Sequence, residues 1–106
     1  MTQDTRAPDL VDLRLYVTGA TPASARAVVN ARRFCEAHLA GRYRLEVLDI
    51  GEHVEQAAED QIVAAPTLIR LAPLPLRRFI GDLSDDERLR RALDPVRVLP
   101  ALGGAG

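Results

Sequence analysis

The chain has 106 residues, with 14 basic against 15 acidic side chains, one cysteine and no tryptophan. This length suits one domain with a single hydrophobic core. The balanced charge gives no electrostatic reason to expect binding to nucleic acid or to an anionic membrane. No apolar run approaches the roughly 20 residues that a membrane-spanning helix needs. A lone cysteine is typical of a reducing compartment, so we expect a cytoplasmic protein.

The first 40 residues predict a leader, a strand and a helix. Residues 1–10 are polar and lack both hydrophobic periodicity and a secretion signal, so we expect a flexible leader. Residues 11–17 alternate apolar and polar side chains, which predicts a strand. A helix is predicted over 22–40, with Thr21 as its cap. Its apolar stripe is expected to consist of Ala25, Val28, Ala31, Cys35 and Leu39.

The middle of the chain predicts three further strands and a short helix. Alternation over 43–50 indicates a second strand, parallel to the first because a helix connects the two. Residues 67–71 and 76–80 predict an antiparallel pair joined by a stiff, proline-containing connection. Residues 52–60 have the spacing of a short amphipathic helix. We expect its solvated face to carry the acids Glu52, Glu55, Glu59 and Asp60.

A last helix is predicted after the fourth strand. Ser84 and Glu87 have the spacing of a capping box, in which each side chain bonds to the backbone N–H of the other residue. Pro95 is expected to stop the helix. The domain is therefore expected over 11–94, and the Ala-, Gly- and Pro-rich residues 95–106 are expected to form a flexible tail.

The element order β-α-β-α-β-β-α predicts a thioredoxin-like α/β domain with a mixed four-stranded sheet. Pro66 precedes the third strand, and Gly81 marks the corner before the last helix. A cis bond costs only about 0.5–1 kcal/mol before proline, so we expect a cis-proline turn at Pro66. In redox enzymes of this fold the turn offers backbone groups to a substrate; here we interpret it as shaping the sheet.

The residues that redox or metal chemistry needs are missing from their usual places. Where a thioredoxin-like enzyme has Cys-x-x-Cys, the helix start has Thr21 and Ser24, whose hydroxyls cannot exchange disulfides. Cys35 lies mid-helix and is expected to be a buried hydrophobe. His38 and His53 have no partner at zinc-ligand spacing, and there is no phosphate-binding glycine loop. We therefore predict no catalytic residue, no metal and no cofactor.

Four blocks of sequence resemble the KaiB family, the small adaptors of the cyanobacterial circadian clock and their wider bacterial relatives. The blocks are residues 13–22 (LRLYVTGATP), 48–50 (LDI), 62–68 (IVAAPTL) and 76–84 (LRRFIGDLS). The resemblance implies a non-catalytic partner of KaiC, a ring-shaped ATPase, whose phosphorylation cycle it modulates, with KaiA-like proteins as further partners. Two alternatives stay open: a KaiB-like sensor or scaffold module of a signalling kinase pathway, and a thioredoxin-fold enzyme that handles glutathione.

The resemblance also points to candidate contact residues. Arg77 and Arg78 lie in the predicted fourth strand, which we expect at a sheet edge where a partner can pair backbone to backbone. They either prevent edge-to-edge aggregation or contact a partner. Arg26, near the start of the first helix, is a further candidate.

Some family members have a second, oligomeric ground state with a rearranged C-terminal half. Glycine at Ala92 would cost the last helix about 1 kcal/mol, whereas alanine favours it. We therefore predict that the thioredoxin-like state is the dominant one in this chain.

Overall fold

The computed structural model describes residues 10–93. The expected tail and nearly all of the expected leader lie outside these residues, as does Pro95. The elements in chain order are β1 (Val11–Val17), α1 (Pro22–His38), β2 (Tyr43–Asp49), η1 (Ile50–Glu52), α2 (Val54–Glu59), β3 (Thr67–Ala72), β4 (Arg77–Ile80) and α3 (Asp86–Leu93).

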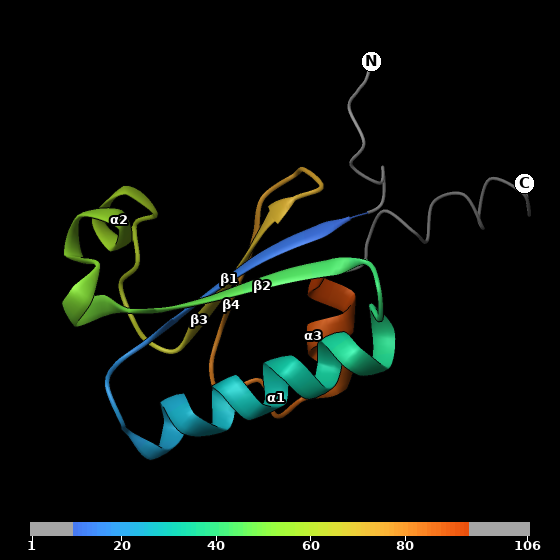
Figure 1. The fold of residues 1–106 in the computed structure, drawn as a ribbon, viewed down its shortest axis with the longest axis horizontal. Helices are drawn as coiled ribbons and strands as arrows, with labels where there is room; N and C mark the ends of the chain where they lie inside the picture. The colour runs from blue at the N-terminus through green and yellow to red at the C-terminus, as the bar shows by residue number, and fades with distance from the viewer. Residues whose placement is uncertain (1–9, 94–106) are drawn as a thin grey trace, which may run out of the picture.

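The four strands form one mixed sheet in the order β2-β1-β3-β4. β1 and β2 are parallel, whereas β3 runs antiparallel to both β1 and β4. Figure 1 shows α1 and α3 together on one side of this sheet, with α2 at one end of it. The predicted thioredoxin-like topology is confirmed, and it leaves β2 and β4 as the edge strands among the described residues.

The main core lies between the sheet and the pair α1 and α3. Alternation along β1 turns one set of its side chains toward these helices, where they meet the buried residues of β3 and α3. This core contains Leu13, Leu15, Leu68, Leu89 and Leu93 together with Ala27, Ala31, Phe34 and Cys35 of α1. A smaller cluster on the opposite face joins α2 to the sheet through Tyr16, Leu48, Ala57 and Ile69.

The predicted apolar stripe of α1 was partly wrong. Ala25 is exposed, whereas Ser24 and Ala27 are buried. Ser24 turns inward because its hydroxyl accepts a 2.9 Å hydrogen bond from the backbone N–H of Thr18. Phe34, which the predicted stripe did not include, is a central core residue at 3% exposure. A polar anchor at the helix start therefore sets which face is buried.

The start of α3 also differs from the prediction. The helix begins at Asp86, and Oδ1 of Asp85 accepts a 3.1 Å hydrogen bond from the backbone N–H of Arg88. The backbone N–H of Ser84 instead donates to Oδ1 of Asp82 at 3.1 Å. The cap is thus Asp85 rather than Ser84, and the carboxylate of Glu87 lies beside Arg90 and Arg91. Ser84 belongs to the preceding corner, so the capping box is not formed.

The turn before β3 and the end of β4 are joined directly. The Ala65–Pro66 peptide bond is cis, and the carbonyl of Pro66 accepts a 3.0 Å hydrogen bond from the N–H of Gly81. Gly81 has φ 139°, a backbone conformation that other residues rarely adopt. The two glycine- and proline-containing segments therefore fix the same end of the β3–β4 hairpin.

Candidate partner-binding surface

β4 is a short edge strand with two exposed arginines, one on each face. Arg77, Arg78 and Ile80 are exposed, and only Phe79 is buried, where it packs into the main core. Among residues 10–93, β3 is the only strand that pairs with β4. The predicted placement of the two arginines on a sheet edge is therefore correct.

The ladder also shows which backbone groups of β4 face outward. Hydrogen-bonded pairs alternate along an antiparallel ladder, and the bond from Gly81 to Pro66 marks one such pair. By this alternation, Phe79 and Arg77 bond to β3, opposite Leu68 and Arg70. The N–H and C=O groups of Arg78 and Ile80 then point toward the open edge, available to another chain.

The three predicted contact arginines do not form one cluster. Arg77 begins β4, at the end of the hairpin opposite Gly81. Nη1 of Arg78 donates to the carbonyl of Gln61 at 3.1 Å. Nε of Arg26 lies 3.2 Å from Oδ2 of Asp82, beyond the other end of β4. The arginines are therefore distributed along the strand, and Arg26 is partly engaged in holding the corner before α3.

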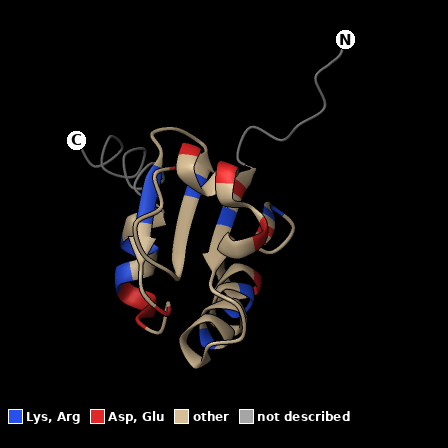
Figure 2. Cartoon of the chain, turned by 90° about the vertical axis from the view of Figure 1, so that its left-hand side faces the viewer, with Lys and Arg blue, Asp and Glu red and all other residues tan. Residues whose placement is uncertain are grey.

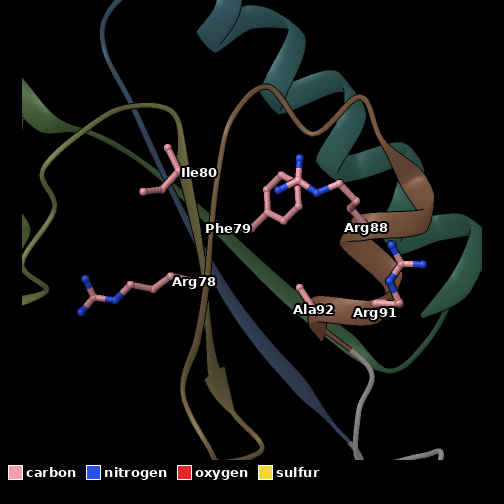
Figure 3. Close-up of a pocket in the computed structure, with 6 residues that line it drawn as sticks. All are labelled: Arg78, Phe79, Ile80, Arg88, Arg91 and Ala92. Carbon is pink, nitrogen blue, oxygen red and sulfur yellow. The ribbon is translucent and has the colours of Figure 1, made fainter.

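Two arginines that the sequence did not single out complete this surface. Arg88 and Arg91 of α3 line a hollow of about 410 Å³ together with Arg78, Phe79, Ile80 and Ala92. Figure 3 shows Arg78 and Ile80 on one side of β4, and Phe79, Arg88 and Arg91 on the other. The guanidinium of Arg88 lies over the ring of Phe79, 5.3 Å from its centroid. The spacing of Arg88 and Arg91, three residues apart in a helix, was the available signal.

The charges of α3 are separated along its length. Asp85, Asp86 and Glu87 lie at its start, and Arg88, Arg90 and Arg91 follow. Figure 2 shows this separation as an acidic segment followed by basic ones on the same side of the molecule as β4. The arrangement complements the helix dipole, and it also concentrates positive charge beside the open strand.

The place of a redox dithiol is occupied by hydrogen-bonded hydroxyls. Oγ1 of Thr21 accepts from the N–H of Ser24 at 3.2 Å, and Ser24 is 2% exposed. Cys35 is 1% exposed, and burial raises the pKa of its thiol to about 12. A thiol that is neutral at physiological pH is a poor nucleophile. Within residues 10–93, no group of three or more His, Cys, Asp and Glu side chains is placed to hold a metal ion.

One acid of the α2 segment is not solvated as expected. Oδ2 of Asp60 lies 3.0 Å from Nη1 of Arg14 and accepts a 2.6 Å hydrogen bond from the hydroxyl of Tyr16. Nε of Arg14 also lies 3.1 Å from the carboxylate of Glu46. Burial, with the Asp60 hydrogen bond second, raises the pKa of Tyr16 to about 12. This cluster fixes the end of α2 to the sheet, so its carboxylates are structural.

A buried arginine supports the candidate surface from beneath. Arg70 of β3 is 1% exposed. Its Nη1 donates to the carbonyl of Leu93 at 2.6 Å, and its Nη2 donates to the carbonyl of Pro75 at 2.8 Å. One guanidinium therefore joins the last residue of α3 to the β3–β4 connection, which fixes the position of β4 relative to α3.

Comparison with known proteins gives the fold and the family. The N-terminal domain of SasA from Synechococcus elongatus has a TM-score of 0.69 at 21% identity, covering 88% of this chain and 91% of that one. Mitochondrial thioredoxin 3 from Saccharomyces cerevisiae has a TM-score of 0.67 at 15% identity, covering 86% of this chain and 82% of that one. Both likenesses concern the fold. No helix within residues 10–93 has the length and apolar character to cross a membrane.

Relatives found by sequence similarity share a larger fraction of identical residues with this chain. The circadian clock oscillator protein KaiB of Synechococcus elongatus is 46% identical over 82 residues, which is 77% of this chain and 80% of the relative. The circadian clock protein KaiB3 of Synechocystis is 42% identical over 84 residues, 79% of this chain and 82% of the relative. The family model of the KaiB domain matches residues 14–95. The chain belongs to the KaiB family of circadian clock proteins, with a thioredoxin-like fold.

Proposed function

We propose that the chain is a non-catalytic adaptor that binds a KaiC-type ring ATPase and modulates its phosphorylation and ATPase cycle, in circadian or stress timing. The observation that carries this proposal is family membership over residues 14–95 combined with an exposed basic edge strand. The family supplies the class of partner. The strand supplies a surface on which such a partner can dock.

The absence of catalysis is inferred from the start of α1 and from Cys35. Thr21 and Ser24 stand at the dithiol position and bond to backbone N–H groups. Cys35 is buried in the main core, and its pKa is raised to about 12. Thiol exchange needs an accessible thiolate, which neither position provides. A scaffold without this chemistry still presents an ordered sheet edge.

Docking would use shape and charge rather than a cofactor. Arg77 and Arg78 project from adjacent positions of β4, so they face opposite sides of the sheet. A ring partner that wraps the strand edge would contact both. Arginine is common at the energetically important positions of interfaces because its planar guanidinium bonds carboxylates in pairs. Arg26 would add a contact beyond the far end of the strand, near Asp82.

The binding-competent form is proposed to be the thioredoxin-like one. Asp85 caps α3, Ala92 favours its last turn, and Arg70 bonds its final carbonyl. Each interaction stabilises the helix in this fold. We therefore propose that a rearranged, oligomeric form is a minor population of this chain.

The test is charge reversal on the strand. Arg77→Glu combined with Arg78→Glu is expected to weaken binding to a purified KaiC-type ring by about tenfold or more, which corresponds to about 1.4 kcal/mol. Both side chains are exposed, so thermal stability should change little. Arg32→Glu, an exposed position on α1, is the control for charge change alone. Undiminished binding of the double variant would show that β4 is not the docking surface.

Two further measurements address the alternatives. Isothermal titration with glutathione should give no heat of binding; saturable binding would favour the glutathione-handling enzyme. Affinity capture from native extract should recover a ring ATPase. Recovery of a sensor kinase or a KaiA-like protein without the ring would favour the signalling module.

A further inference from the structure

We propose that the open edge of β4 binds an extended acidic peptide segment of a partner protein, which adds to the sheet as a fifth strand. The proposal rests on the outward backbone groups of β4, on arginines at both of its faces and on the hollow between β4 and α3. This proposal concerns the binding of a peptide, which can be measured in the absence of the ring ATPase. Either proposal can therefore fail while the other stands.

The backbone of β4 provides the first requirement. By the alternation of the ladder, the N–H and C=O groups of Arg78 and Ile80 point away from β3. A peptide added to a sheet edge gains its affinity from such groups. An incoming segment of about four to six residues, at about 3.3 Å per residue, is long enough to pair with both Arg78 and Ile80.

Side chains on both faces of β4 provide the second requirement. Successive residues of an added strand point to opposite faces of the sheet. On one face they would meet Arg78, and on the other Arg88 and Arg91, which border the same hollow. Consecutive carboxylates of an extended segment would therefore each meet a guanidinium. Ile80, 55% exposed beside Arg78, provides an apolar contact for one residue.

The arginines of α3 are held in place for this role. Arg88 lies over the ring of Phe79, a contact that orients its guanidinium beside the strand. Nη1 of Arg91 is 3.4 Å from the carboxylate of Glu87, and both side chains are more than half exposed. Exposed helical ion pairs of this kind contribute little to stability, so a ligand carboxylate can replace Glu87.

The surface suits an acidic peptide better than three other occupants: a second copy of β4, residues 94–106 of the chain, or nucleic acid. Pairing two copies of β4 would place Arg77 and Arg78 of one copy against those of the next, and like charges across strands are destabilising. Residues 94–106 contain one acid and one arginine, so they do not complement the surface. Proteins that bind single-stranded nucleic acid stack its bases on exposed aromatic side chains, whereas Phe79 is only 8% exposed.

The probe is a fluorescein-labelled peptide, Gly-Glu-Glu-Glu-Val-Glu-Glu-Gly, titrated with the full chain by fluorescence anisotropy. We expect saturable binding that weakens with added salt. Arg88→Glu combined with Arg91→Glu, and separately Arg78→Glu, should weaken it by about tenfold or more. The matched control is Arg90→Glu, on the same helix but outside the hollow, with an expected change below about threefold. Equal weakening by Arg90→Glu would indicate unspecific charge attraction and overturn the proposal.

Backbone pairing is tested with the unmodified protein. Two versions of the peptide carry N-methyl groups on alternate residues, one version on each set. Because only one set of N–H groups faces β4 in an added strand, one version should lose binding and the other should retain it. Equal behaviour of the two versions would overturn the fifth-strand proposal. So would comparable binding of a peptide with lysine in place of glutamate, or of a single-stranded oligonucleotide.

Discussion

Arg70 and Arg77 are direct partners across the β3–β4 ladder, yet they have opposite environments. Arg70 is buried and bonds the carbonyls of Leu93 and Pro75, whereas Arg77 is exposed. The same chemical group therefore serves the fold in one strand and is available to a partner in the next. The difference arises from position in the sheet: α3 ends over β3, and nothing in residues 10–93 pairs with the outer side of β4.

The largest effect is expected from removing the buried member of this pair. Arg70→Met keeps much of the side-chain volume but leaves the buried carbonyl of Leu93, and that of Pro75, without the guanidinium that bonds them. The expected loss is about 3 kcal/mol of unfolding free energy. For a domain of this size that lowers Tm by more than about 10 °C, measurable by calorimetry.

Arg77→Met is the matched control, because it makes the same change one strand away. Since Arg77 is exposed, its loss should change stability by less than about 0.5 kcal/mol. Similar losses for the two variants would mean that the carbonyl bonds of Arg70 add little, and the contrast between the strands would not hold.

A second prediction concerns how two buried groups, Cys35 and Tyr16, make stability depend on alkaline pH. The pKa of Cys35 is raised from 9.0 to about 12, and that of Tyr16 from 10.0 to about 12. In both cases the folded state holds its proton to higher pH than the unfolded state does. Stability should therefore be constant below pH 9 and fall as pH rises toward 12, by at most about 1.4 kcal/mol per pH unit for each group.

Urea unfolding between about pH 8 and about pH 11 measures this slope, because this interval covers the pH at which the decline begins. Every basic residue of the chain is arginine, so no lysine titration overlaps with it. Tyr16→Phe should reduce the slope above pH 10, and Cys35→Ala should delay its onset from pH 9. A slope that both variants leave unchanged would place the alkaline-sensitive groups elsewhere.

A smaller effect is expected at the last turn of α3. Ala92→Gly should cost about 1 kcal/mol of helix stability. If a rearranged form exists, the variant should raise its population by about fivefold, since about 1.4 kcal/mol corresponds to tenfold. NMR spectra and sedimentation report the two forms. Dominance of an oligomer in the unsubstituted chain, with residues 86–93 not helical, would contradict the proposed preference.

The sequence was sufficient for features that depend on local patterns. Alternation in 11–17 and 43–50 predicted the parallel pair, and residues 67–71 and 76–80 with their proline-containing connection predicted the antiparallel pair. The buried Cys35 followed from its place in an amphipathic helix. The edge position of Arg77 and Arg78 followed from topology alone.

Features that depend on distant partners were beyond the sequence. A single arginine in an apolar strand does not reveal that Arg70 bonds Leu93, 23 residues later. Asp60 was assigned to a solvated face because its partners, Arg14 and Tyr16, are more than 40 residues away. The sequence did not single out the arginines of α3, because only packing against Phe79 brings Arg88 beside β4.

The two hydrogen bonds of Arg70, to the carbonyls of Leu93 and Pro75, have a consequence for local unfolding. If α3 loosens, Arg70 loses its hydrogen bond to Leu93 and the hairpin is held less firmly. If the hairpin is displaced, α3 loses the same hydrogen bond. α3 and β4 should thus open as a single cooperative unit, with amide hydrogens exchanging at matched rates in both. A partner that binds the edge of β4 would therefore also stabilise α3.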